Sequence, residues 1–120
     1  MDTLSTVLVA LVGILHIYFL YLEMFMWKKP IGLKTFRMSP EKAKMTAPLA
    51  ANQGLYNGFL AAGLLYSLFV TNPDTAHSFK VFFLSCVAIA GVFGAGTVSK
   101  RIFFIQSLPA ILALVIIVLC

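Results

Sequence analysis

Four long apolar stretches occupy most of this 120-residue chain and restrict what it can fold into. They cover residues 3–27, 47–71, 77–98 and 102–120. Each has about 20 residues, and a helix of that length crosses the roughly 30 Å hydrocarbon core of a bilayer. The stretches lack the alternation of apolar and polar residues that marks a transmembrane β-strand. We therefore expect an all-α, integral membrane four-helix bundle, formed by a single domain over residues 1–120.

The composition is typical of a protein that lies in the lipid bilayer. Hydrophobic residues make up 61% of the chain and charged residues 11%, with a mean hydropathy of +0.98. Soluble domains average about 45–50% apolar and about 25% charged residues. The first stretch follows Asp2 rather than Lys or Arg and lacks a small-residue cleavage site. We therefore expect it to remain as the first helix and not to be removed as a signal peptide.

The basic residues are concentrated in two of the connections between these stretches. Six of the nine Lys and Arg residues lie in residues 28–46, and Lys100 and Arg101 lie in residues 99–101. Connections rich in Lys and Arg stay in the cytoplasm, so we expect both loops to be cytoplasmic and both termini to lie outside. This clustering accounts for the net charge of +5 without nucleic acid as a partner. The larger loop suits an anionic inner leaflet, through general attraction or a specific headgroup site.

Between the first two stretches the sequence predicts little regular structure. We expect an irregular loop over residues 31–38, which contains a glycine. Ser39 and Pro40 are suited to begin a helix, so a short surface helix is expected over residues 40–45. The second membrane helix is then expected to begin anew at residues 46–48.

Polar side chains gather near the start of the second stretch. Residues 50–63 read AANQGLYNGFLAAG, and the hydrogen-bonding side chains in this segment are Asn52, Gln53, Tyr56 and Asn57. Amides are costly in hydrocarbon unless they are paired, so we expect this group to face the interior of the bundle. The first stretch offers His16 and Glu23, whose spacing places them on one face of a helix.

Antiparallel helices bring these residues to matching depths. At a rise of about 1.5 Å per residue, Glu23 is level with Asn52 and Gln53, whereas His16 lies deeper, level with Tyr56 and Asn57. Gln106 of the fourth stretch falls in the layer of Glu23. We predict that Glu23 lies within hydrogen-bonding reach of Asn52 or Gln53. The predicted ligand site therefore comprises His16, Glu23, Asn52, Gln53, Tyr56, Asn57 and Gln106.

This cluster is compatible with several functions. In a binding role, its amides and Tyr56 would orient a small or lipid-like molecule, and Glu23 and His16 would exchange protons. The same acid and base would serve a membrane enzyme acting on a lipophilic substrate, or a small proton-coupled transporter. In a structural or accessory subunit the amides would only fasten helices, at about 0.6–2 kcal/mol each. No familiar catalytic set, metal motif or cofactor motif is present, so catalytic residues stay unassigned and we expect no metal and no cofactor.

Small residues favour close packing of the second and third stretches. In the third stretch the small-xxx-small pairs are Ala90 with Gly94 and Gly91 with Ala95. This spacing allows helix backbones to approach closely in a membrane. The chain has more such surface than four helices need, so we expect a homo-oligomer.

Two segments resemble a known family. LVGILHIYFLYLEMFMW and LAANQGLYNGFLAAGLL are similar to segments of a bacterial family of small four-span membrane proteins that is defined only as a domain of unknown function. The resemblance covers nearly the whole chain, with His16, Glu23 and Trp27 at the expected places. It implies a multi-pass protein of the bacterial cytoplasmic (inner) membrane and assigns no activity.

A weaker likeness links the chain to the membrane-associated proteins of eicosanoid and glutathione metabolism. Those proteins are small four-helix membrane proteins, typically trimeric, and their second helix holds glutathione with Arg, Asn and Glu. The corresponding stretch here has Asn52 and Asn57 but neither Arg nor an acid. This difference argues against a glutathione site.

Overall fold

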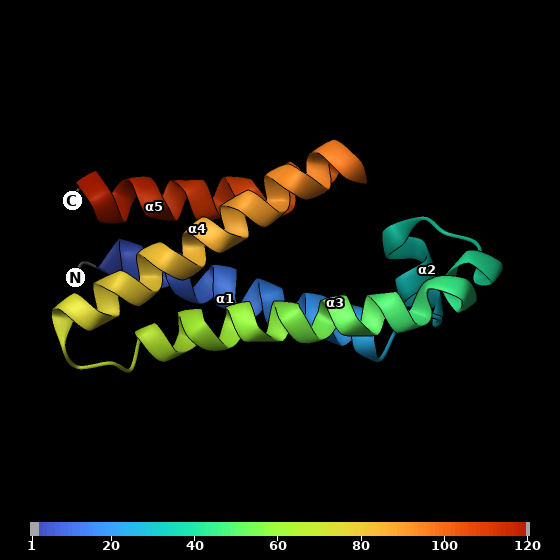
Figure 1. Cartoon of the computed structure of the whole chain (residues 1–120), viewed down its shortest axis with the longest axis horizontal. Coiled ribbons are helices and arrows are strands. Elements are labelled where there is room, and N and C mark those ends of the chain that lie inside the picture. Colours follow the sequence, from blue (N-terminus) through green and yellow to red (C-terminus); the bar gives the residue numbers. More distant parts are fainter. Residues whose placement is uncertain (1–2, 120) are drawn as a thin grey trace. The chain divides into compact units, whose positions relative to one another are not determined.

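The structure is a computed structural model that describes residues 3–119, and every regular element in this range is helical. The helices are α1 (Thr3–Met24), α2 (Pro30–Phe36), α3 (Pro40–Ser67), α4 (Pro73–Thr97) and α5 (Leu108–Leu119), and a π-helical turn, η1 (Phe103–Ser107), precedes α5 (Figure 1). The all-α prediction is therefore confirmed. Two of these helices, α1 and α4, are long and apolar enough to cross a membrane. The predicted ends of the domain and of the last stretch, at residues 1 and 120, lie outside the described residues.

Helix α1 ends three residues earlier than the first apolar stretch. The Met26 N–H is shared between the carbonyl oxygens of Tyr21 and Leu22, at 3.2 and 3.3 Å. Such shared hydrogen bonds are common where a helix ends. The chain then turns, and the Lys29 N–H bonds to the Met26 carbonyl at 3.1 Å. Trp27 therefore lies in the turn that follows α1 and not in the last helical turn of α1.

Helix α2 replaces the irregular loop that we predicted over residues 31–38, so that prediction was wrong. Pro30 begins the helix, where its missing N–H removes no hydrogen bond. Arg37 ends it in the left-handed region at φ 52°, and its N–H bonds to the Leu33 carbonyl. Gly32 is buried, and a Cβ there would collide with the carbonyl oxygens of Met26 and Trp27. This glycine therefore permits a close approach of two backbone segments and does not mark a flexible loop.

Helix α3 runs without a break through residues 46–48, where we expected a second helix to begin. The Thr46 hydroxyl donates to the Lys42 carbonyl at 2.7 Å, as it does within a continuous helix. Pro48 lies inside the helix. It lacks the N–H that would bond to the Lys44 carbonyl, and the helix tolerates this single loss.

The π-helical turn before α5 has a similar origin. Pro109 cannot donate to the Ile105 carbonyl, and the preceding turn is widened so that the Leu108 N–H bonds to the Phe103 carbonyl. Gln106 lies on this turn and is half-buried. Together, η1 and α5 make a continuous apolar segment over Phe103–Leu119.

The chain divides into two compact parts. The first comprises Met1–Ile14 and Leu60–Cys120, and the second comprises Leu15–Phe59. Within the first part, α4 packs along η1 and α5 (Figure 1). Its core consists of buried aliphatic side chains: Val9, Val12, Leu64, Leu84, Val87, Ala110 and Ala113.

The glycines of α4 allow this packing. A Cβ on Gly91 would collide with Ser107, and one on Gly94 would lie 2.9 Å from Cγ2 of Ile102. The Ser107 hydroxyl donates to the Ala88 carbonyl at 2.6 Å, directly across this contact. The close approach predicted from the small-residue spacing is therefore present between α4 and the segment that leads into α5.

Candidate functional site

Glu23 of α1 and Asn57 of α3 form a direct polar contact in the second compact part of the chain. The Asn57 Nδ2 donates to Oε1 of Glu23 at 2.5 Å. Asn57 is 4% exposed, whereas Glu23 is half-buried. A carboxyl group in an apolar helix requires a polar partner, and Asn57 supplies it.

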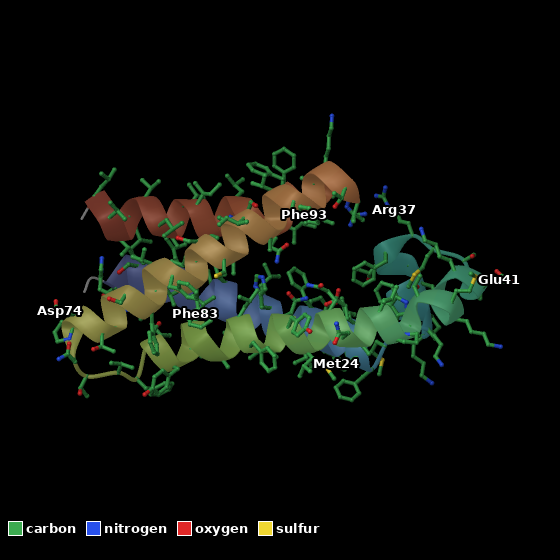
Figure 2. All side chains as sticks on the ribbon, in the orientation of Figure 1. Met24, Arg37, Glu41, Asp74, Phe83 and Phe93 are labelled. Atoms are coloured by element: carbon green, nitrogen blue, oxygen red, sulfur yellow. The ribbon has the colours of Figure 1, made fainter. Side chains whose placement is uncertain are left out.

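Two glycines bring α3 close enough to α1 for this contact. A Cβ on Gly54 would lie 2.7 Å from Cγ of Met24 and 3.1 Å from Cβ of Glu23. A Cβ on Gly58 would lie 2.6 Å from Cδ1 of Leu20. Met24 is labelled in Figure 2, next to α3. The short Asn57 side chain therefore reaches Glu23 because Gly54 and Gly58 leave no side chain between the helices.

The second polar atom of the Asn57 amide has a different environment. Its Oδ1 is buried and has no hydrogen-bond partner among the described residues. A buried acceptor left without a donor costs about 1–3 kcal/mol. Such an atom is satisfied when a donor group comes from elsewhere, for example from a bound molecule.

His16 lies about two helical turns before Glu23 on α1. Its side chain is completely buried, and its ring contacts Phe19 edge-on, with 5.1 Å between the ring centroids. The seven-residue spacing to Glu23 corresponds to about 10 Å along one helix face. Within residues 3–119, no three His, Cys, Asp or Glu side chains gather as a metal site.

The hydrogen bond to Glu23 does not involve Asn52, Gln53 or Tyr56 of α3. Asn52 and Gln53 are exposed, and Tyr56 is 51% exposed with its ring against Phe59. We predicted that Glu23 would reach Asn52 or Gln53, and this pairing was wrong. The hydrogen bond is formed by Asn57 instead, one helical turn further along α3.

The packing of the two helices explains this difference. The face of α3 that meets α1 carries Gly54 and Gly58, and at about 100° per residue Asn57 lies at the edge of that face. Asn52 points to another side of the helix. Close packing of small residues therefore decides which polar side chain meets Glu23.

Of the seven residues in the predicted site, Gln106 is the one that lies in the first compact part of the chain. It lies on η1, whereas the other six predicted residues lie within Leu15–Phe59. Its role at the site stays a prediction.

Trp27 has a role that the sequence did not indicate. Its indole N–H donates to the Thr46 hydroxyl at 3.0 Å, and its ring packs on Phe36 with 4.7 Å between centroids. The side chain therefore ties α2 to the first turns of α3. The signal in the sequence that could have indicated this role is the matching depth of Trp27 and Thr46 at the facing ends of the first two apolar stretches.

Known proteins resemble this chain over nearly its full length. Residues 10–118 match the family described as "Protein of unknown function (DUF1304)". The chain belongs to this family. It is also 30% identical over 117 residues to the "Uncharacterized protein YpaA" of Lactococcus lactis subsp. lactis (strain IL1403), which covers 96% of this chain and 97% of the relative. No solved structure shows significant similarity.

These matches confirm the resemblance to a bacterial family defined as a domain of unknown function. The family's description names no activity. Both Glu23 and Asn57 lie within the matched range.

Proposed function

We propose that this protein spans the bacterial cytoplasmic membrane four times and binds a small or lipid-like molecule at Glu23 and Asn57. The apolar character of α1 and α4 supports the membrane assignment, and the Phe103–Leu119 segment is a shorter apolar helix. The remaining span, which is the second along the chain, would be α3 from about residue 47 onward. The basic residues of 28–46 and 99–101 support cytoplasmic positions for both loops, with the termini outside.

The observation that carries the binding proposal is the buried Oδ1 of Asn57, which has no hydrogen-bond partner within residues 3–119. This oxygen accepts hydrogen bonds, and the half-buried carboxyl group of Glu23 lies next to the same amide. Two neighbouring acceptors suit a molecule that brings a donor, such as an alcohol or an amine. The lipid surroundings favour an apolar body on that molecule.

The exposed polar residues of α3 support a ligand that extends along this helix. Gln53 precedes Asn57 by four residues, about one turn, so its exposed amide lies on the same side of α3. Tyr56 presents an exposed ring and hydroxyl group beside it. In this proposal Asn57 and Glu23 hold the head of the ligand, and Gln53 and Tyr56 contact the rest. His16 acts as a second proton-exchanging group deeper on α1.

The main rival is a purely structural role, in which the same hydrogen bond only fastens α1 to α3. Two variants separate the roles. Glu23→Gln keeps the shape and can still accept from Asn57, whereas Glu23→Leu removes the polar partner. The measured quantity is the thermal unfolding temperature of the protein in nanodiscs. It is compared in the presence of decanol and of decyl methyl ether, which has no hydrogen-bond donor.

In the binding proposal, decanol stabilises the wild-type protein more than the ether does. Glu23→Gln then folds normally and loses this difference. In the structural alternative, Glu23→Gln is silent, Glu23→Leu is destabilised, and decanol acts like the ether in every variant. The last pattern contradicts a binding function.

We also propose that the protein forms a homo-oligomer. Apart from the glycine itself, its chain neighbours and its own helix backbone, no described atom lies within 4 Å of a Cβ built on Gly96 of α4. Ala62 of α3 is exposed, so some small-residue surface remains uncovered. Such surfaces allow close helix contacts between chains. Mass measurement in nanodiscs should give a multiple of the single chain, and Gly96→Val should lower that multiple. A single-chain mass for the wild-type protein contradicts this proposal.

A further inference from the structure

The connection between α1 and α3 carries a strongly basic surface over residues 28–46, which we call the basic surface. Its six basic side chains are all exposed: Lys28, Lys29, Lys34, Arg37, Lys42 and Lys44. Glu41 is the one acidic residue in this range, so at least five of the six positive charges have no opposite charge within the segment. The whole segment belongs to the compact part Leu15–Phe59.

Packing against the turn after α1 holds this surface together. The Trp27 ring packs on Phe36 of α2, and its indole N–H donates to Thr46 of α3. Gly32 of α2 lies against the backbone of Met26 and Trp27. One side chain therefore contacts both helices, and the basic residues of α2 and of the start of α3 are carried by one folded unit.

Exposed apolar side chains lie between these charges. Ile31 and Phe36 of α2 are exposed, and Met45 and Leu49 of α3 are 82% and 73% exposed. Lys42, Met45 and Leu49 follow one another at spacings of three and four residues, so they lie along one side of α3. That side changes from charged to apolar along the helix. It suits the border between lipid headgroups and acyl chains, whereas a soluble polyanion would leave the apolar side chains in water.

We propose that the basic surface docks against anionic phospholipid headgroups of the cytoplasmic leaflet in which the protein lies. The Lys and Arg side chains contact the lipid phosphates, and Met45 lies among the upper parts of the acyl chains. Clusters of about four to eight basic residues beside a membrane helix attract such lipids. The long basic side chains can lie along apolar surface while their charged ends reach the phosphates. This inference rests on the membrane assignment proposed above and not on the ligand site at Glu23 and Asn57.

The fluorescence of Trp27 tests this proposal, because Trp27 is the one tryptophan of the chain and borders the basic surface. The full-length protein is placed in vesicles of equal parts phosphatidylglycerol and phosphatidylcholine. One lipid at a time is replaced by its form brominated in the upper acyl chain, which quenches nearby tryptophan. Brominated phosphatidylglycerol should quench Trp27 more strongly than brominated phosphatidylcholine. The headgroup composition is the same in both measurements, so this excess quenching reports local enrichment of the anionic lipid.

Matched charge variants locate the source of the excess. Lys34→Gln with Arg37→Asn removes two of the six charges and should lose at least about a third of the excess. Asparagine is chosen because residue 37 has φ 52°, a backbone conformation that asparagine tolerates. Lys100→Gln with Arg101→Asn removes the same residue types outside the basic surface and should keep the excess. Glu23→Gln should also keep it, which separates this proposal from the binding proposal.

Spin labels test the contact with the acyl chains. In a background without Cys86 and Cys120, a label at Met45→Cys should be more accessible to oxygen, which dissolves in lipid, than to a water-soluble nickel chelate. Glu41→Cys, exposed in the first turn of α3, is the control, and its label should show the reverse preference. Figure 2 labels Glu41 at this end of α3 and Arg37 after α2.

Equal quenching of Trp27 by the two brominated lipids overturns the proposal and favours a soluble acidic partner. Equal loss of the excess in both charge variants also overturns it, because the net charge of the protein would then attract the lipid. A label at Met45→Cys that prefers the nickel chelate contradicts the contact with acyl chains. Both leaflets of these vesicles have the same composition, so the results do not depend on the orientation of the protein.

Discussion

Asn57 donates a hydrogen bond to Glu23, with 2.5 Å between Nδ2 and Oε1, while its own Oδ1 is buried without a partner among the described residues. One side of this amide joins two helices, and the other side makes no hydrogen bond within residues 3–119. The proposed function rests on this division.

Asn57→Leu should destabilise the protein by about 0.6–2 kcal/mol, the range for hydrogen bonds between membrane helices. The loss arises because Glu23 would remain in an apolar setting without its donor. Unfolding in mixed micelles with increasing denaturing detergent measures it. Asn52→Leu is the matched control, and it should change stability little because Asn52 is exposed. Equal effects of the two substitutions would contradict the structure.

Gly54→Val should destabilise the same helix contact more strongly than Gly58→Ala. At Gly54 a Cβ meets Met24 and the Cβ of Glu23, which stands on the helix backbone and cannot rotate away. At Gly58 the contact is the end of the flexible Leu20 side chain. Overpacking of this kind costs about 1–3 kcal/mol. The same detergent titration measures both, and a larger effect at Gly58 would count against the observed face of α3.

Trp27→Phe should lower the unfolding free energy by about 0.5–1.5 kcal/mol, because it removes one hydrogen bond to Thr46 and keeps a ring against Phe36. Thr46→Val removes the acceptor of the same bond. A double-mutant cycle tests whether the two effects have one cause. The double variant should be less destabilised than the sum of the single variants. Full additivity would show that the bond contributes nothing.

The topology predicts which connections react with a reagent that does not cross the membrane. In a background without Cys86 and Cys120, Thr35→Cys should stay unlabelled in intact cells, because residues 28–46 are predicted to be cytoplasmic. Thr75→Cys, at the start of α4, is the positive control and should be labelled. The reverse pattern would invert the proposed orientation.

The helical character of the chain could be predicted from sequence because it depends on the length and hydrophobicity of each stretch. The pairing of Glu23 could not, since it depends on which face of α3 meets α1. Asn52, Gln53 and Tyr56 were expected to face inward because they are polar. Gly54 and Gly58 face inward instead, because two helix backbones pack closest where side chains are smallest.

The structure of the connection between α1 and α3 could not be predicted from sequence either. Gly32 suggested a loop, whereas in the structure it lies in a helix against the carbonyl oxygens of Met26 and Trp27. Thr46 suggested the start of a helix, whereas it bonds to Trp27 and Lys42 inside one. Each role is set by a residue from another segment, and local patterns do not reveal such partners.

The most direct test of the binding proposal is NMR of the Asn57 side-chain amide in nanodiscs, with the signal assigned by Asn57→Leu. Decanol is titrated in parallel with decyl methyl ether. A bound hydroxyl group that donates to Oδ1 should shift the Asn57 amide signals saturably, and the ether should leave them unchanged. Equal shifts with both compounds, or no shift with either, would contradict a donor-binding site at Glu23 and Asn57.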